Sequence, residues 1–149
     1  MSDSPSDNLS AVPGQLKLRR ALPWFLAYAV ALALIAFWPQ HVDKGAGPFL
    51  QALMHLLPIV TPHRVEFGAN IVLFVPLGAL LAILVPRRRH LIMPVGFLVS
   101  LTIESIQGVL LDGRTASIYD IIANTAGACI GLLLIEFIES VLRRSRKTS

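Results

Sequence analysis

Four long apolar runs dominate the sequence and restrict the folds open to this chain. The first, Ala21–Trp38, holds 18 residues without a charged side chain. A helix needs roughly 20 apolar residues to cross the hydrocarbon core of a bilayer, which is about 30 Å thick. Three further runs of sufficient length lie at 67–85, 91–111 and 121–142. The sequence therefore predicts an all-α integral membrane protein, a bundle of four transmembrane helices.

The composition favours lipid as the surrounding medium. Hydrophobic residues make up 54% of the chain and charged residues 15%, whereas soluble domains average roughly 25% charged residues. The net charge of +4 would favour nucleic acid in a soluble domain. Here the basic residues flank apolar runs, so we expect membrane lipids as partners and no nucleic acid.

Cysteine and histidine usage predicts neither a disulfide nor a metal site. The single cysteine, Cys129, cannot form an intrachain bridge. The four histidines show no compact ligand spacing, so we expect no metal and no cofactor. They are His41, His55, His63 and His90.

Outside the long runs, the sequence predicts two tails and one short segment. Residues 1–20 are polar and predict a disordered cytoplasmic tail, the membrane domain is expected over 21–142, and 143–149 forms a basic tail. The apolar segment 49–60 would extend only about 18 Å as a helix, so it should be interfacial or re-entrant. A cleaved signal peptide is the alternative for the first run, although that run continues beyond its small-residue cleavage site.

Lysine and arginine predict the orientation. Ten of the 13 basic residues fall in three clusters, which four spans would place on one side of the membrane. These clusters are Lys17/Arg19/Arg20, Arg87/Arg88/Arg89 and Arg143/Arg144/Arg146/Lys147. Because positive charge is retained on the cytoplasmic side, both termini are expected in the cytoplasm.

Polar residues inside or at the edge of the spans are the candidates for function, because an ionisable group there costs about 2.5–3.5 kcal/mol. Within each span they are spaced three or four residues apart, which places them on one helical face. The set comprises Glu66 and Asn70, then Ser100, Glu104 and Gln107, then Asp120 and Asn124.

Four spans bring these faces together in the outer half of the bundle. We expect a polar pocket open to the extracytoplasmic side, with Arg114 as the shared counter-ion of Glu104 and Asp120. The alternative is that the residues only hold helices together by hydrogen bonds. That alternative is favoured for Asn70, Ser100 and Asn124 taken alone, whereas the charged group favours binding or catalysis.

Small residues predict where helices pack closely. Gly127 and Gly131 form a G-x-x-x-G pair on the face of the fourth span that carries Asp120 and Asn124. The sequence leaves open whether the neighbouring helix belongs to the same chain or to a second copy. Pro76 and Gly78 predict a kink in the second span.

Three segments in this order resemble the VanZ-like family of small bacterial membrane proteins. They are NIVLFVPLG from Asn70, ESIQ from Glu104, and GRTASIYDIIANTAGACIG from Gly113. The resemblance covers roughly the last half of the chain. It implies a multi-pass protein of the bacterial plasma membrane, and the family's namesake is associated with resistance to glycopeptide antibiotics of the teicoplanin type. It carries over most of the polar set together with Arg114, Pro76, Gly78, Gly127 and Gly131.

Three functions are consistent with this pattern. The first is a non-catalytic cell-envelope protein whose pocket binds an amphiphile, such as a lipid-linked cell-wall precursor or a lipoglycopeptide. The second is a membrane enzyme acting on a lipid-linked substrate, with Glu104 or Asp120 as general acid or base. The third, a small proton-coupled exporter, is disfavoured because the carboxylates gather toward one face of the membrane.

Overall fold

Helices account for all the regular structure in the part of the chain that can be described. The computed structural model describes residues 13–37, 61–110 and 117–146, with side chains from residue 20 onward. Within these ranges the α-helices are α1 (Pro13–Ala36), α3 (Pro62–Leu84), α4 (Ile92–Leu110) and α5 (Ile118–Ser145). A short 3₁₀-helix, η2 (Arg89–Leu91), precedes α4. The all-helical class is therefore confirmed.

Local sequence explains where α3 begins and ends. Thr61 lies in extended conformation before the helix, and its side chain accepts a hydrogen bond from the backbone amide of Arg64. Pro62 follows at the first helical position, where its missing N–H costs nothing. Val85 closes the helix and precedes Pro86. A tight turn then leads into η2, with the amide of Arg88 donating to the carbonyl of Val85 at 2.9 Å.

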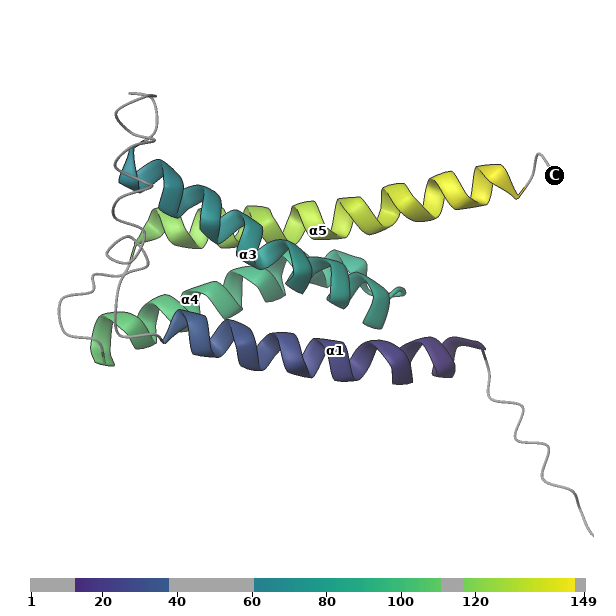
Figure 1. Cartoon of the computed structure of the whole chain (residues 1–149), viewed down its shortest axis with the longest axis horizontal. Coiled ribbons are helices and arrows are strands. Elements are labelled where there is room, and N and C mark those ends of the chain that lie inside the picture. The colour runs from purple at the N-terminus through teal and green to yellow at the C-terminus, as the bar shows by residue number, and fades with distance from the viewer. Residues whose placement is uncertain (1–12, 38–60, 111–116, 147–149) are drawn as a thin grey trace, which may run out of the picture.

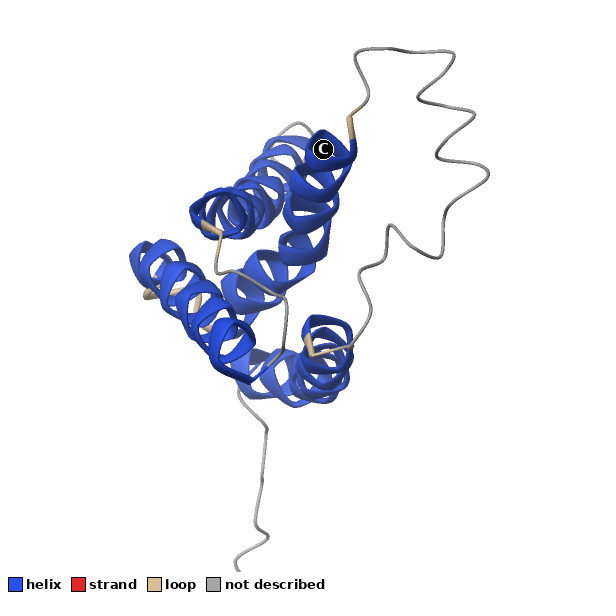
Figure 2. Ribbon diagram, turned by 90° about the vertical axis from the view of Figure 1, so that its left-hand side faces the viewer, coloured by secondary structure: helices blue, strands red, loops and turns tan. Residues whose placement is uncertain are grey.

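Consecutive described helices run in opposite directions, so their ends gather at two opposite ends of the molecule (Figure 1). At one end α1 and α4 finish while α3 and α5 begin. At the other end α1 and α4 begin while α3 and α5 finish. Figure 2 looks along the helices from the first of these ends and shows them lying side by side.

Helix α5 packs against both α3 and α4, while α1 packs on the far side of α3. The core between α1 and α3 consists of Leu32, Phe74 and Leu77. The hydroxyl of Tyr28 in α1 also donates a hydrogen bond to the backbone carbonyl of Leu73 in α3. Because Pro76 has no N–H to donate to the carbonyl of Val72, α3 lacks one intrahelical bond at the residue next to Leu73.

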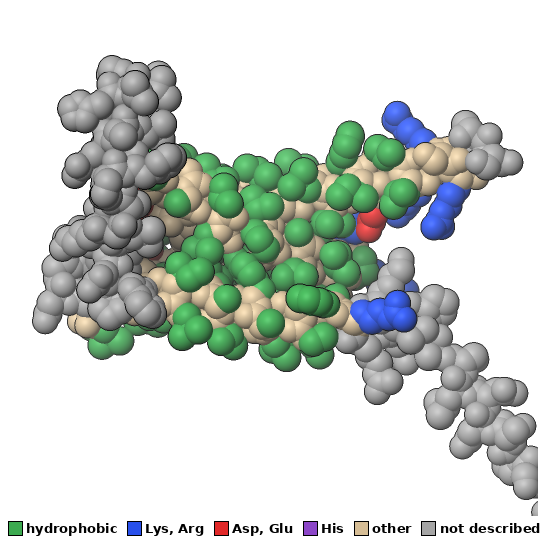
Figure 3. Space-filling model, in the orientation of Figure 1, with side chains coloured by type: hydrophobic (Ala, Val, Ile, Leu, Met, Phe, Trp, Pro, Cys, Tyr) green, Lys and Arg blue, Asp and Glu red, His purple; other side chains and the backbone are tan. Residues whose placement is uncertain are grey.

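Large apolar side chains cover the outside of the helices (Figure 3). Three helical segments are long and apolar enough to cross a membrane: Pro62–Leu84, Arg89–Leu110 and Ile118–Ser145. The apolar part of α1 within the described residues, Arg20–Ala36, is shorter. An exposed apolar surface of this kind is stable in lipid and not in water, so the chain is a membrane protein.

The helices extend beyond the apolar runs from which they were predicted. Helix α1 begins at Pro13, within residues 1–20, which the sequence assigned to a polar tail. Proline at the first position and the good helix formers from Gln15 to Arg20 favour this extension, although Gly14 between them does not. Helix α5 likewise continues through Arg143 and Arg144 to Ser145, into the expected basic tail. The segment 49–60, expected to be interfacial or re-entrant, lies outside the described residues.

Candidate functional site

Four polar side chains are buried among the described residues, and each belongs to the set selected from the sequence. They are Ser100, Glu104 and Gln107 on α4 and Asn124 on α5. Glu104 and Asn124 are each only 4% exposed. We refer to these four residues as the polar cluster.

Glu104 caps the N-terminus of α5 with a hydrogen bond. Its Oε2 accepts a hydrogen bond of 2.8 Å from the backbone amide of Ser117, the residue that precedes the helix. The first amides of a helix lack partners within the helix, and the helix dipole favours a negative charge there. The side chain of Ser117 makes no capping bond of its own. Glu104 therefore supplies from α4 a cap that α5 does not supply for itself.

Gln107, one turn further along the same face of α4, holds the end of α1. Its Nε2 donates a hydrogen bond of 2.6 Å to the backbone carbonyl of Ala36, the last residue of that helix. The last carbonyls of a helix lack intrahelical partners in the same way as the first amides. The E-x-x-Q segment thus closes the ends of two neighbouring helices from one face of α4.

A second polar contact lies about one helical turn deeper. Asn124 Nδ2 donates to Ser100 Oγ at 2.9 Å, and this bond joins α5 to α4. Asn124 Oδ1 is also buried, yet it has no hydrogen-bond partner among the described residues. A buried amide oxygen without a donor is costly, and in native structures it usually indicates a bound water or ligand group.

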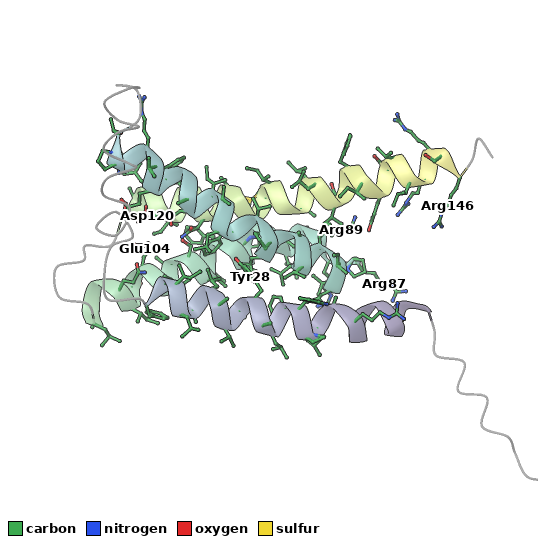
Figure 4. All side chains as sticks on the ribbon, in the orientation of Figure 1. Tyr28, Arg87, Arg89, Glu104, Asp120 and Arg146 are labelled. Carbon is green, nitrogen blue, oxygen red and sulfur yellow. The ribbon has the colours of Figure 1, made fainter. Side chains whose placement is uncertain are left out.

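Asp120 lies at the same end of the molecule as Glu104 (Figure 4). It stands in the first turn of α5 and is half-buried. On α3, Asn70 is half-buried and Glu66 is exposed, so the structure does not bring Glu66 into the buried cluster. Nearby, the rings of His63 and Tyr119 meet edge to face with centroids 5.1 Å apart. Arg114, the expected counter-ion, lies outside the described residues.

Helices α3 and α5 pack closely at three glycines, Gly78, Gly127 and Gly131. A Cβ added at Gly78 would collide with the backbone of Ala128, and one at Gly131 would collide with the backbone of Val75. Gly127 approaches the carbonyl of Ile71 in the same way. The glycines of α5 therefore pack against α3 of the same chain, which answers the question that the sequence left open.

An ion-pair network forms at the opposite end of the molecule. Arg89 Nη2 lies 2.7 Å from Glu139 Oε1, its Nη1 lies 3.9 Å from Glu136, and its Nε donates to the carbonyl of Ala82. Glu139 also lies 3.7 Å from Arg143. The pair with Arg143 follows from the spacing i, i+4, whereas the closer pair with Arg89 has no signal in the sequence because the two residues are far apart in the chain.

Comparison with known families shows which family the chain belongs to. The VanZ/LLP1 family model matches residues 25–139, which is most of the chain. The chain belongs to the VanZ/LLP1 family. No curated protein and no solved structure gives a match.

The VanZ/LLP1 match contains the whole polar cluster, the three glycines of the α3–α5 contact, and Arg89 with its partners Glu136 and Glu139; Arg143 lies beyond the match. It extends the resemblance, which rested on three short segments, back to residue 25 in α1. The helix whose end is closed by Gln107 is therefore part of the VanZ/LLP1 unit, together with the three helices that carry the motifs.

Proposed function

We propose that this VanZ/LLP1 protein binds the polar head group of an amphiphile at the polar cluster, on the extracytoplasmic side of the membrane. The observation that carries the proposal is the buried Asn124 Oδ1, which has no partner among the described residues. Hydrogen bonds that only hold helices together explain the Asn124–Ser100 contact. They do not explain an acceptor left open beside it, since such an atom costs about 1–3 kcal/mol.

Asn124 Oδ1, the acceptor without a described partner, favours a ligand that donates hydrogen bonds. An amide oxygen accepts, so a hydroxyl, amide or amine group of the head group would satisfy it. Exposed apolar residues on the adjoining helix, including Val109 and Leu110 of α4, would accompany the hydrocarbon tail. Arg114 is the residue that we expect to meet an anionic part of the same head group.

A lipid-linked cell-wall precursor or a lipoglycopeptide combines these properties, and binding of either would contribute to glycopeptide tolerance. Glu104 supports a binding function more than an acid–base function, because its Oε2 already accepts a hydrogen bond from the start of α5. A membrane enzyme would instead turn over a lipid-linked substrate, and the Glu104→Gln variant would lose that turnover.

Two alanine variants test the binding role of Asn124. Both Asn124→Ala and Ser100→Ala remove the bond between the two residues, but only Asn124→Ala removes the open acceptor. With purified protein in nanodiscs, we expect Asn124→Ala to weaken binding of teicoplanin or of a lipid-linked cell-wall precursor about tenfold. Ser100→Ala should bind within about twofold of the unaltered protein. If both variants lose the same binding affinity, or if neither loses any, then Asn124 Oδ1 does not contact the ligand and the proposal is wrong.

The Arg114→Ala variant tests the same proposal in cells. Its expression and folding should be unchanged, while lipid binding and any glycopeptide tolerance conferred by the protein should fall. Unchanged binding and tolerance in Arg114, Glu104 and Asp120 variants together would contradict the proposed function.

The proposed orientation has a separate test. In a Cys129→Ala background, Ile118→Cys should react with a membrane-impermeant maleimide added to intact cells, because Ile118 is exposed at the start of α5. Arg87→Cys, at the opposite end, should react only after the membrane is permeabilised. The opposite labelling pattern would place the polar cluster on the cytoplasmic side and overturn the orientation.

A further inference from the structure

The end of the molecule opposite to the polar cluster carries exposed arginines from three parts of the chain. Figure 4 shows Arg87, Arg89 and Arg146 at this end and Glu104 and Asp120 at the other. Four of the arginines are exposed and form no ion pair with a described residue. They are Arg20 on α1, Arg87 and Arg88 in the turn after α3, and Arg146 at the end of α5.

Arg89 differs from its neighbours in the same turn. Its side chain is 19% exposed, forms ion pairs with Glu139 and Glu136, and donates a hydrogen bond to the carbonyl of Ala82. The acidic groups of this end are therefore engaged by Arg89 and, through Glu139, by Arg143. Arg87 and Arg88 keep their positive charge and their hydrogen-bond donors for a partner from outside the described chain.

Apolar surface lies beside these free arginines. The C-terminal part of α5 and the N-terminal part of α1 extend past the end of α3, so the turn with Arg87 and Arg88 is set back between them (Figure 1). Phe137 and Val141 on α5 and Leu22 and Trp24 on α1 are exposed along these extensions. A partner for this region must combine an anionic group with hydrocarbon.

We propose that this end of the protein is a binding site for an anionic phospholipid. The phosphate lies against the guanidinium groups of Arg87 and Arg88, which match phosphate oxygens in geometry and charge. The acyl chains lie along the exposed apolar sides of α1 and α5. This site is separate from the polar cluster and does not depend on the function proposed for it.

The test measures how much added lipid each variant retains. Purified protein is exchanged into phosphatidylglycerol or phosphatidylcholine, and the bound lipid is counted by native mass spectrometry. Each surface-facing arginine strengthens association with anionic lipid about fivefold, so Arg87→Gln/Arg88→Gln should reduce retention of phosphatidylglycerol roughly 25-fold. Retention of phosphatidylcholine should be low and unchanged. Equal retention of the two lipids by the unaltered protein would overturn the proposal.

Two controls separate lipid binding from folding. Arg89→Gln/Glu139→Gln removes the internal ion pair without changing the net charge, and it should lower thermal stability while phosphatidylglycerol retention stays within about twofold. Arg87→Lys/Arg88→Lys keeps the charge and should retain more phosphatidylglycerol than the glutamine variant. If the internal-pair variant loses the lipid as strongly as Arg87→Gln/Arg88→Gln, the site is not in the turn.

If millimolar inorganic phosphate displaces phosphatidylglycerol completely, the site binds a free anion and the lipid assignment is wrong.

Discussion

Replacing Gly78 with alanine is expected to lower the free energy of unfolding by about 3 kcal/mol. The added Cβ would lie 2.7 Å from the carbonyl carbon and 2.8 Å from the Cα of Ala128, and closer still to its carbonyl oxygen. These are backbone atoms in the middle of α5, so no side-chain rotation relieves the collision and α3 must move away. Alanine is favoured over glycine within a helix by about 1 kcal/mol, and this gain is too small to offset the separation of the helices.

Gly68 on the same helix provides the matched control. No atom lies within 4 Å of a Cβ added there, so Gly68→Ala should leave the stability unchanged or raise it by up to about 1 kcal/mol. Unfolding in mixed micelles with increasing dodecyl sulfate, followed by far-ultraviolet circular dichroism, measures both variants. Equal stability of Gly78→Ala and Gly68→Ala would contradict the close packing of α3 on α5.

Replacing Glu104 with leucine is expected to destabilise the protein by about 2–4 kcal/mol, the second large effect. Leucine fills a similar volume, but it leaves the amide of Ser117 without the acceptor that it has at 2.8 Å. It also removes the negative charge from the positive end of α5. In the membrane, water is a poor substitute for the lost acceptor, so the penalty should exceed that of an exposed helix cap.

Glutamine at position 104 separates the hydrogen bond from the charge. Glu104→Gln keeps an oxygen that can accept from Ser117, and we expect it to cost only about 1 kcal/mol. Hydrogen exchange of the first amides of α5 should quicken strongly in Glu104→Leu and weakly in Glu104→Gln. Ser105→Ala is the control, because Ser105 is exposed and bonds to Leu101 within α4. It should change neither the free energy of unfolding nor the hydrogen exchange at the start of α5. A leucine variant as stable as the glutamine variant would show that the cap is not needed.

The cost of burying polar groups in a membrane made the polar cluster predictable. Ser100, Glu104, Gln107 and Asn124 stand out in apolar runs because each needs a partner there, and all four are buried. Their partners were not predictable in the same way. Glu104 and Gln107 bond to backbone atoms at helix ends, and a backbone amide or carbonyl is present at every residue and so leaves no trace in the sequence.

Helical periodicity identifies a face but not the direction in which that face points. Glu66 and Asn70 share one face of α3, yet Glu66 is exposed and only Asn70 is partly covered. Near the end of a helix a long charged side chain can reach the polar edge of the membrane, so its presence there carries little information. Gly127 and Gly131 likewise marked a packing face, while the choice of α3 as the partner depended on the three-dimensional arrangement of the chain.

Position in the chain also explains why the Arg89 network was missed. The pair Glu139–Arg143 lies within one turn of α5 and follows from spacing alone. Arg89 is 50 residues before Glu139, and in the sequence it resembles the other two members of its basic cluster, Arg87 and Arg88. Only the folded chain distinguishes it from Arg87 and Arg88.

The two bonds made by α4 also set the order in which the protein can be assembled during synthesis. The carbonyl of Ala36 and the side-chain amide of Gln107 are 71 residues apart, so this bond forms only after α4 has been made. Once α4 is in place, its Glu104 receives the start of α5 after only 13 more residues. Helix α4 therefore bonds to the end of α1 through Gln107 and to the start of α5 through Glu104, and a chain interrupted before residue 104 would form neither bond.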